Sequence, residues 1–471
     1  MRASSKKSRR LFQAQLEQFG KLGILFISAF SKDFYNLCEY SYQNIHMEQI
    51  VLRRREAEEL KKARGWLLVY GRRKVGKTFL LRRELSWSIY ATVTRSREIF
   101  LESDGGIEKT GLEEGLQRVV DALRRGECVV IDEFQRLPEN YWDMLALAHP
   151  SGRLVLSGSS FGVVEKVFSR RSPLLGLVNP LRVDVVSYAD AVSSLVERLD
   201  PEKALLWAII VRDPWIVPFV DLSLSPAVFI AENAGRLALA SMGLVGEVFV
   251  EEERRLTTLY EAVLRLLAEG YWKPAEIAGV LAPKGLVEGG ASAVVGILER
   301  MAKMGLVRKL KVWKSGGAKA YYRHSSPLLS LVYYLDQKFS VSEGYPATPE
   351  AANTALGKEA EACIAELMAE RYSGVPGFYV SPFGDVDVIV LKGKRPIAGY
   401  EVKLGIIEQN EAKRALERIH SLGIPHAGLI SLKEKPPEIE GAETLGPDEL
   451  VYLAKMVSET KIPTKKAHES R

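Results

Sequence analysis

The sequence contains few cysteines and no long hydrophobic run, and neither sign of charge dominates it. Its three cysteines, Cys38, Cys128 and Cys363, are too few for a disulfide framework or a cysteine-based metal cluster. Such a low cysteine content is typical of a reducing compartment, and we expect a cytoplasmic protein. No apolar stretch approaches the roughly 20 residues that a membrane helix needs, so we expect no membrane span.

The charge and composition are those of a globular protein. With 65 basic and 59 acidic residues, the net charge is +6, a small excess that permits contact with nucleic acid without requiring it. Hydrophobic residues make up 47% of the chain and charged residues 26%. A chain of 471 residues is too long for one hydrophobic core, so we expect about three domains.

One stretch has the pattern of a phosphate-binding loop. Residues 71–78 match G-x-x-x-x-G-K-[ST], between the apolar run Trp66–Tyr70 and the helix-like segment Phe79–Leu85. The glycines let backbone N–H groups point at phosphate oxygens, Lys77 reaches the β- and γ-phosphates, and Thr78 ligates Mg²⁺. The flanking strand and helix favour ATP binding over a simple glycine turn. The predicted nucleotide-binding residues here are Gly71, Arg72, Arg73, Lys74, Val75, Gly76, Lys77, Thr78 and Phe79.

A second motif places two carboxylates at the end of an apolar strand. The run Val129–Ile131 leads directly into Asp132 and Glu133. Downstream of a phosphate loop, Asp132 would hold Mg²⁺ through water, and Glu133 would orient and deprotonate the attacking water. An acidic pair at a strand end is also common without any such role. We predict Lys77 and Glu133 as catalytic residues, with Asp132 contacting both nucleotide and metal.

Residues 65–190 alternate strand and helix, which predicts a parallel sheet covered on both faces. The expected strands are Trp66–Tyr70, Ile89–Thr94, Val129–Ile131, Arg153–Ser157 and Leu181–Val186. Ligands bind beyond the carboxyl ends of such strands. We therefore expect Ser157 or Ser159 to sense the γ-phosphate, although a Ser-Gly-Ser-Ser turn is also ordinary loop chemistry.

The middle of the chain predicts a helical lid and then a winged helix. Residues 191–255 are helical in tendency and are interpreted as a lid over the nucleotide. Three helices and a hairpin follow, which is the order of a winged helix; they are Leu259–Leu267, Lys273–Leu281, Ala291–Lys303, Leu306–Lys314 and Ala318–His324. The hairpin carries Arg308, Lys309, Lys311, Lys314 and Lys319. These residues predict a phosphate-contacting wing, but winged helices also serve only for packing between proteins, and both uses stay open.

The C-terminal part has a second group of charged residues on predicted strands. After a linker at residues 342–349, the expected elements are an amphipathic helix Leu356–Tyr372, strands Gly377–Ser381, Asp385–Leu391 and Ala398–Leu404, a helix at 408–422 and strand His426–Leu432. Side chains two apart on a strand share a face, so Glu401 and Lys403 point the same way, and Asp387 can lie near both.

These residues suit metal-dependent attack on a phosphodiester. Asp387 and Glu401, with Glu361 from the preceding helix, would hold Mg²⁺, and Lys403 would position or deprotonate a water. The predicted catalytic residues of this site are Asp387, Glu401 and Lys403. The competing interpretation is a solvated sheet face with a surface salt bridge.

The chain resembles the archaeal ATPase family, AAA-like P-loop proteins of the wider STAND group. The motifs that carry the resemblance are Gly71–Thr78, Val129–Gln135 and Leu156–Ser160, with Arg53–Leu60 similar to the start of the family's ATPase domain. Residues Leu356–Glu359 through Glu401–Lys403 resemble a restriction-endonuclease-like domain of the PD-(D/E)xK type. The resemblance spans about residues 47–435 and implies a sheet with an additional strand, Glu133 as catalytic glutamate, and a winged helix between the two catalytic parts.

Two departures from the family pattern predict slow hydrolysis. The segment Ser172–Gly176 is followed by Leu177 rather than arginine, and the usual Gly-Gly-x-Pro of the lid is replaced by the segment Arg212–Pro218. The first departure removes an arginine contact to the active site, and the second removes the usual lid turn. We therefore expect the loop to act more as a switch than as a motor.

The resulting expectation is an α/β protein with five segments. These are an N-terminal extension at 1–46, with Met47 as the true start, a P-loop ATPase core at 47–190, a helical lid at 191–255, a winged helix at 256–340 and a nuclease-like domain with a basic tail at 350–471. The expected function is Mg²⁺-dependent ATP hydrolysis that controls a DNA-associated module with nuclease activity. The alternatives are a nucleotide switch with a non-catalytic C-terminal module and a DNA-binding regulator; a protein partner or a second copy of the chain also stays open.

Overall fold

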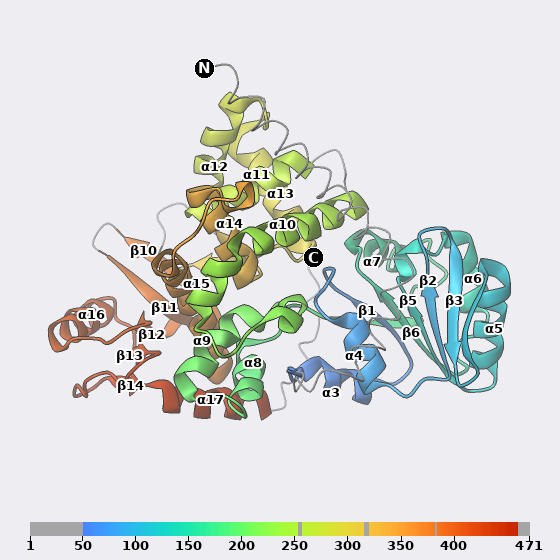
Figure 1. Ribbon diagram of the computed structural model, residues 1–471, viewed down its shortest axis with the longest axis horizontal. Helices are drawn as coiled ribbons and strands as arrows, with labels where there is room; N and C mark the ends of the chain where they lie inside the picture. Colours follow the sequence, from blue (N-terminus) through green and yellow to red (C-terminus); the bar gives the residue numbers. More distant parts are fainter. Residues whose placement is uncertain (1–49, 253–256, 315–319, 382–383, 460–471) are drawn as a thin grey trace, which may run out of the picture. The chain divides into compact units, whose positions relative to one another are not determined.

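The computed structural model describes residues 50–252, 257–314, 320–381 and 384–459 (Figure 1). The chain divides into two units, Met1–Ile50 and Val51–Arg471, and the elements below belong to the second. The expected extension, the start at Met47, Lys319 and the basic tail lie outside the described residues.

The first part of the second unit is built on a seven-stranded sheet, called sheet A, in the order β4-β3-β2-β5-β6-β1-β7. Its strands are β1 (Trp66–Tyr70), β2 (Ile89–Val93), β3 (Glu98–Ser103), β4 (Gly106–Gly111), β5 (Cys128–Asp132), β6 (Arg153–Gly158) and β7 (Val178–Arg182). Strands β2, β5, β6, β1 and β7 run parallel, as predicted. The phosphate-loop strand β1 therefore lies between β6 and β7.

Two features of sheet A differ from the prediction. β3 and β4 form an antiparallel hairpin on one edge, so the sheet is mixed rather than parallel. Most residues of β4 are exposed, so this strand lacks the apolar run that marks a buried one. The last strand begins at Val178 and ends at Arg182, instead of spanning Leu181–Val186. It contains Pro180, which an edge strand tolerates.

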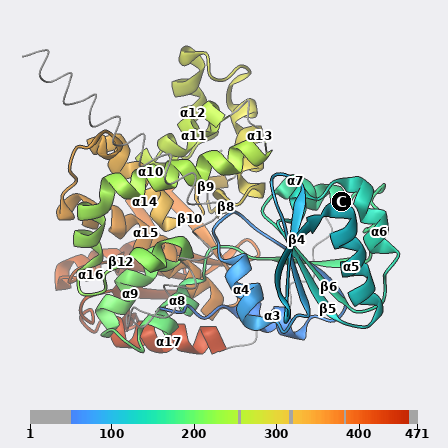
Figure 2. The same cartoon turned by 45° about the vertical axis from the view of Figure 1, so that its right-hand side comes forward.

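Alternating side chains of β1 supply two separate cores. Trp66 and Leu68 pack into the core beneath α5 (Leu112–Arg124), whereas Leu67 and Val69 pack into the core beneath α4 (Lys77–Glu84). This alternation is the period of a strand that is buried on both faces. Figure 2 shows sheet A with helices α5 and α6 (Trp142–Ala146) on one side, and α4 and α3 (Arg55–Lys62) on the other.

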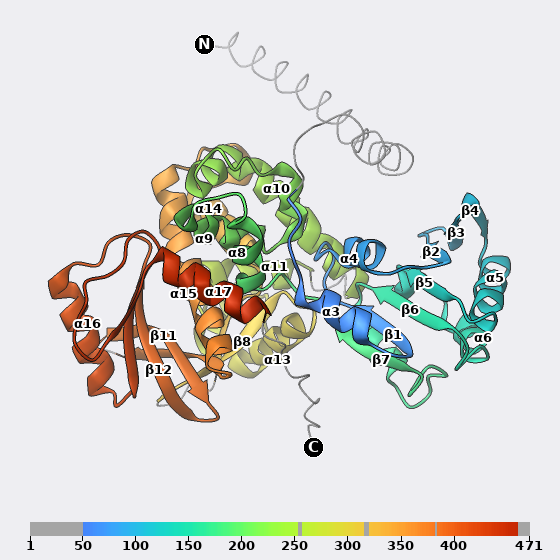
Figure 3. The same cartoon turned by 90° about the horizontal axis from the view of Figure 1, so that it is seen from below.

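The segment predicted as a lid is helical but packs against the C-terminal part. It forms α8 (Tyr188–Leu195), α9 (Pro201–Val211), the 3₁₀ helix η3 (Pro214–Phe219) and α10 (Pro226–Glu252). Helix α8 contacts the last helix, α17 (Pro447–Glu459), and α9 and α10 contact α15 (Pro349–Arg371). Figure 3 shows α17 beside α8 and α15. Sequence reasoning missed α17 and therefore these contacts.

Helix α10 is long and apolar enough to cross a membrane when judged by length and composition alone. Its residues 226–249 have a mean hydropathy of 1.3. The helix packs against α14 (Pro327–Phe339) and α15, as a helix of a protein core does. Length and composition do not separate these two kinds of helix, and the expectation of no membrane span stays a prediction.

The three helices of the expected winged helix are present, but its hairpin is not a free wing. They are α11 (Thr257–Glu269), α12 (Pro274–Leu281) and α13 (Gly290–Lys303), followed by β8 (Val307–Val312) and β9 (Ala320–His324). Strand β8 also pairs in parallel with β10 (Val375–Ser381) of the C-terminal part, with Lys311 opposite Gly377. The hairpin is therefore part of a second seven-stranded sheet, sheet B, in the order β14-β13-β12-β11-β10-β8-β9.

The basic residues of this hairpin that the structure describes have intramolecular partners, which favours packing among the two uses of the winged helix that the sequence left open. Arg308 pairs with Glu366 at 2.5 Å, Lys309 pairs with Glu299 at 2.6 Å, Lys311 donates to the Gly393 carbonyl at 3.4 Å, and Lys314 donates to the Leu422 carbonyl at 3.0 Å. Charges that are already paired within the chain contribute less to phosphate binding, so the geometry favours packing.

The rest of sheet B follows α15 in the chain. An antiparallel meander of β10, β11 (Gly384–Lys392) and β12 (Arg395–Lys403) leads through α16 (Gln409–Ser421) to the parallel strands β13 (His426–Ser431) and β14 (Glu443–Leu445). The prediction of an amphipathic helix over Leu356–Tyr372 was wrong in its start and in its exposure. Helix α15 begins at Pro349 and has buried residues on more than one face, including the consecutive residues Cys363, Ile364 and Ala365. It is a central helix rather than a surface one.

Candidate nucleotide-binding site

The phosphate loop turns between β1 and α4 at residues 71–76. Gly71 lies so close to the neighbouring chain that an added Cβ would be 1.8 Å from the Val183 carbonyl oxygen. Gly76, just before α4, has φ +90°, a left-handed conformation that favours glycine. Only glycine fits the first position without moving the backbone, and the second position also favours it, as a phosphate cradle requires.

Lys77, the first residue of α4, turns its side chain into the loop. Its Nζ donates to the carbonyls of Gly71 at 2.7 Å and Arg72 at 3.0 Å. Burial lowers the pKa of Lys77 to about 8, while the carboxylates of Asp132 and Glu133 oppose that shift. A phosphate group in the loop would favour the charged ammonium further, since an opposite charge raises a lysine pKa.

Thr78 and Asp132 meet across the ends of α4 and β5. The Thr78 hydroxyl donates to Asp132 Oδ2 at 2.7 Å, and the Tyr90 hydroxyl donates to the same oxygen at 2.8 Å. The backbone N–H of Glu133 donates to Asp132 Oδ1 at 2.9 Å. A hydroxyl beside a carboxylate is a donor set that fits Mg²⁺. Tyr90 was missed by sequence reasoning; its signal was its place on the strand that neighbours β5.

Glu133 follows β5 in a left-handed conformation, with φ +56°. Its Oε2 accepts a hydrogen bond from Gln135 Nε2 at 2.9 Å and pairs with Arg136 Nη2 at 2.7 Å. Gln135 Nε2 also donates to Ser159 Oγ at 2.9 Å. The structure therefore brings Ser159 to this site. Ser157 is fully buried and its hydroxyl has no hydrogen-bond partner among the described residues, which argues against direct contact with nucleotide.

The side chains of Arg72 and Arg73 have partners in other parts of the chain, and their predicted contact with nucleotide stays a prediction. Arg72 is fully buried and donates to both carboxylate oxygens of Asp213, at 2.7 and 2.8 Å. The same carboxylate accepts from the Ser326 hydroxyl at 2.5 Å, at the start of α14. Arg73 pairs with Glu247 of α10 at 3.3 Å. These two arginines can offer their backbone N–H groups to phosphate, while their side chains bind other parts of the chain.

Of the other predicted loop residues, Val75 is buried within the core beneath α4. Lys74 is exposed and has φ +62°. Phe79 is 44% exposed on the first turn of α4. The structure brings neither of these exposed side chains onto the carboxylates of the site, and their predicted contact with nucleotide stays a prediction.

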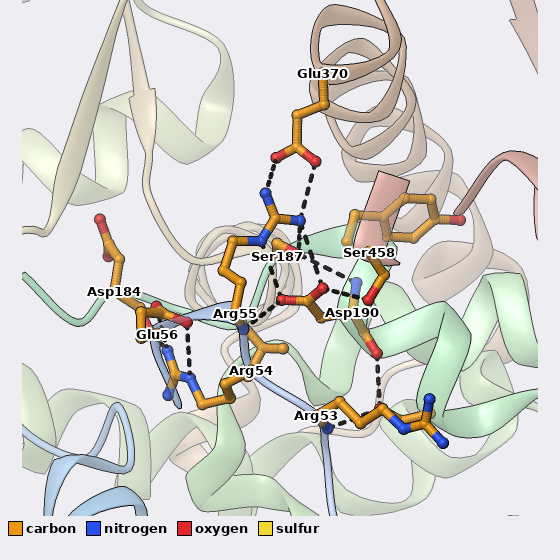
Figure 4. A network of polar contacts seen from close by, with 12 residues as sticks. Arg53, Arg54, Arg55, Glu56, Asp184, Ser187, Asp190, Glu370 and Ser458 are labelled. Atoms are coloured by element: carbon orange, nitrogen blue, oxygen red, sulfur yellow. Dashed lines mark hydrogen bonds and ion pairs between the residues drawn. The ribbon is translucent and has the colours of Figure 1, made fainter. Parts of the chain in front are cut away.

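Two arginines at the start of α3, its N-cap Arg54 and its first residue Arg55, contact the phosphate loop and the C-terminal part (Figure 4). Arg54 donates to the backbone carbonyls of Val75, inside the loop, and of Asp184, after β7. Arg55 forms a two-pronged pair with Glu370 of α15, with both distances 3.0 Å, and contacts Asp190 at 3.1 Å. In the sequence, the stretch Arg53–Leu60 carried only a family resemblance, and this role of Arg54 and Arg55 was missed.

The predicted carboxylates of the C-terminal part come together on sheet B. Burial raises the pKa of Glu361 to about 8, with further contributions from Asp387, Asp385 and Glu401. Burial and Asp387 likewise raise the pKa of Glu401 to about 7. Asp387 and Glu401 lie on the paired strands β11 and β12, and Glu361 on α15 is close enough to both for their charges to raise its pKa.

The geometry does not form the expected metal site. Among the described residues, no group of three His, Cys, Asp or Glu side chains is arranged to hold a metal ion. Glu401 pairs with Arg418 at 2.6 Å, Lys403 pairs with Glu411 at 2.8 Å, and Asp387 accepts from the Val402 N–H at 2.8 Å. The prediction placed these residues correctly on neighbouring strands but missed the partners that α16 supplies.

Comparison with known proteins gives fold likeness only. No protein-family model and no curated protein matches the sequence. Among solved structures, the chain is similar to the Walker-type ATPase PABY2304 of Pyrococcus abyssi, with TM-score 0.42, 18% identity and coverage of 59% of this chain and 94% of that one.

The ORC2 protein of Aeropyrum pernix, in ADPNP and ADP complexes, gives TM-score 0.37 at 15% identity and covers 64% of this chain and 97% of its own. The STAND protein PH0952 of Pyrococcus horikoshii gives 0.27 at 16% identity, covering 70% and 50%. Because every one of these TM-scores is below 0.5, the function proposed below rests on the site geometry.

Proposed function

We propose that the protein binds ATP with Mg²⁺ and hydrolyses it at the loop of residues 71–78. The observation that carries this is the convergence of Lys77, Thr78, Asp132 and Glu133 at the carboxyl ends of β1 and β5. In an open parallel sheet, this edge is where ligands bind.

The residues have separate roles in this proposal. Lys77 exchanges its two carbonyl partners for phosphate oxygens, and the N-terminus of α4 adds a favourable dipole for the anion. Thr78 and Asp132 would hold Mg²⁺, which supplies charge neutralisation of the phosphates when bound. Glu133 accepts the proton of the attacking water.

The decisive experiment compares ATP binding and phosphate release in wild type, Lys77→Ala and Glu133→Gln proteins. Lys77→Ala should lose binding, and Glu133→Gln should retain binding but lose turnover by about 10²-fold or more. Lys203→Ala, an exposed lysine on α9, serves as the matched control. A Lys77→Ala protein that binds and hydrolyses ATP like wild type would end the proposal.

We further propose that the nucleotide state controls the C-terminal part through α15. One connection starts at the buried Arg72–Asp213 pair of the loop. The neighbour of Asp213, Arg212, donates to both oxygens of Glu366 on α15 at 2.7 Å. Burial alone would raise the pKa of Glu366, but Arg212 and Arg308 hold it well below its usual range. Glu366 therefore stays charged and paired.

A second connection uses another pair of consecutive residues. Arg54 holds the loop carbonyl of Val75, and its neighbour Arg55 holds Glu370, which lies one helical turn after Glu366 on α15. Both connections therefore join the loop to the same end of one helix. A change in the loop backbone on binding ATP would act on α15 at two points.

Hydrogen exchange in residues 349–371, measured with and without ATP, tests this control. Nucleotide should increase protection of α15 in wild type. In Arg55→Ala, which breaks one connection, the increase should be reduced while ATP still binds. The matched control is Arg371→Ala, which lies in the same helix and removes an ion pair with Glu443 of β14. Equal nucleotide-induced protection in Arg55→Ala and wild type would show that Arg55 carries no coupling.

The second candidate function is a metal-dependent nuclease in the C-terminal part, favoured by the cluster of Glu361, Asp387 and Glu401. Binding a divalent cation there would require Arg418 to release Glu401. Cleavage of DNA should then need Mg²⁺ or Mn²⁺ and should be lost in Asp387→Ala and Lys403→Ala. If wild type cleaves nothing, the C-terminal part is a non-catalytic module that binds DNA or a protein partner.

A further inference from the structure

The side chain of Gln135 joins the ends of two neighbouring strands of sheet A. Gln135 lies in η1 (Phe134–Arg136), directly after β5, and Ser159 follows β6. Gln135 Nε2 donates to Glu133 Oε2 and to Ser159 Oγ, both at 2.9 Å, while its Oε1 accepts from the Ser159 N–H at 3.3 Å. The amide nitrogen and the amide oxygen of Gln135 thus both have partners. If the amide were flipped, its nitrogen would face the Ser159 N–H, and both groups are donors.

These contacts fix one oxygen of the Glu133 carboxylate, Oε2, and leave the other oxygen, Oε1, available to a water molecule. Oε2 is held by Gln135 and by Arg136, whose other guanidinium nitrogen donates to the Val93 carbonyl at 3.1 Å. Oε1 accepts no hydrogen bond within the part of the chain that the structure describes. A general base needs one free oxygen in a fixed direction, and this arrangement provides it.

The end of β6 leaves just enough room for the amide. A Cβ added to Gly158 would lie 3.1 Å from Gln135 Oε1, which is tighter than ordinary contact. The lack of a side chain at Gly158 thus leaves room for the Gln135 amide, and an added Cβ would press on it. The position of Gln135 can be disturbed from β6 without changing Gln135 itself.

We propose that Gln135 is a positioning residue for Glu133 and that it links the carboxylate to Ser159 at the end of β6. This inference rests on the proposed ATP hydrolysis. A displacement of Ser159 moves the amide and, with it, Glu133 Oε2. Catalysis is sensitive to such movement because a misplacement of about 1 Å can reduce a rate by about 10²-fold.

The test measures kcat, KM and the pH dependence of ATP hydrolysis in Gln135→Ala and Gln135→Glu. Gln135→Ala should lower kcat by about 10- to 100-fold with KM for ATP unchanged, because the partners of the amide are Glu133 and Ser159 rather than the phosphate loop. Gln135→Glu places a second carboxylate beside Glu133, which should raise the pKa of the base and shift the acid limb of the kcat profile to higher pH. A purely structural role would not move that limb.

Controls separate this inference from the proposed function. Gln117→Ala removes an exposed glutamine that bonds Asp121 on α5, and it should leave kcat unchanged. Gly158→Ala should reproduce the kcat loss from the β6 side, with thermal melting showing that the variants fold. In the Glu133→Gln background, Gln135→Ala should add little, because both changes remove one function.

The outcomes are distinct. If wild type releases no phosphate from ATP, the proposed function fails and the role of Gln135 fails with it. If wild type turns over and Glu133→Gln does not, while Gln135→Ala and Gln135→Glu keep the wild-type kcat and pH profile, only the inference about Gln135 is overturned.

Discussion

Replacing Asp213 by alanine should destabilise the protein strongly, because it leaves the charge of Arg72 buried without its partner. Both side chains of this pair are 0% exposed. Asp213 accepts two hydrogen bonds from Nη2 of Arg72, while Nε and Nη1 of Arg72 have no hydrogen-bond partner among the described residues. Breaking such a buried pair from one side typically costs about 3–5 kcal/mol. Ser326→Ala removes one bond to the same carboxylate and should cost about 1.5–3 kcal/mol.

Removing both charges should restore most of that loss. Arg72→Met together with Asp213→Leu replaces the pair by apolar side chains, which is often neutral for stability when the volume is filled. Urea unfolding followed by tryptophan fluorescence measures the free energy of unfolding of each variant. The double variant should also lose part of the nucleotide-induced protection of α15, since its connection from the loop is broken.

Two results would refute this reasoning. If Asp213→Ala unfolds at the same urea concentration as wild type, Arg72 is not held as a buried charge. If the double variant is stable and still shows full protection of α15 with ATP, the Arg72–Asp213 pair serves the fold and carries no signal. The second result would leave only the Arg54–Arg55 connection.

Three further outcomes follow from the geometry. Gly71→Ala should reduce ATP affinity by at least about 10-fold, because its Cβ would meet the Val183 carbonyl at 1.8 Å, whereas Gly279→Ala, where nothing lies within 4 Å, should not. Burial lowers the pKa of His324 to about 4 while its bond to the Leu264 carbonyl opposes the shift, so the neutral form is the folded one. Stability from this residue is present above about pH 6.5 and should fall by up to about 3 kcal/mol as pH drops to 4, a slope that His324→Leu should remove in acid titration of the unfolding free energy. Lys309→Ala should change DNA affinity less than about twofold at any salt concentration, because Lys309 is paired with Glu299; a loss that grows at low salt would restore the wing hypothesis.

The sequence was sufficient for the phosphate loop because its chemistry is local. Residues 71–78 need glycine, lysine and threonine at fixed spacing, and the apolar run before them fixes β1, so the strand and the start of α4 were predicted within a residue or two. The same local logic located Asp132 at the end of β5. Local sequence also gave the three helices that precede β8.

The sequence was insufficient where partners are far apart in the chain. Arg72 and Asp213 are separated by 141 residues, and Arg55 and Glu370 by 315. Neither pair leaves a periodic or motif signal, so Arg72 was assigned to phosphate contact and the role of Arg55 was missed. The same limit explains the hairpin of β8 and β9: its pattern predicts two strands, but nothing local indicates that β10 pairs with β8.

That pairing has a consequence for how the chain can be divided. Because β8 and β10 belong to one sheet, residues 257–339 and 349–459 share a continuous set of backbone hydrogen bonds. A cut at the apparent linker would leave the edge of β8 in one fragment and the edge of β10 in the other, both open to pairing with foreign strands. The two segments are therefore one structural unit, and neither should transfer to another protein, or survive proteolysis, as an independent module.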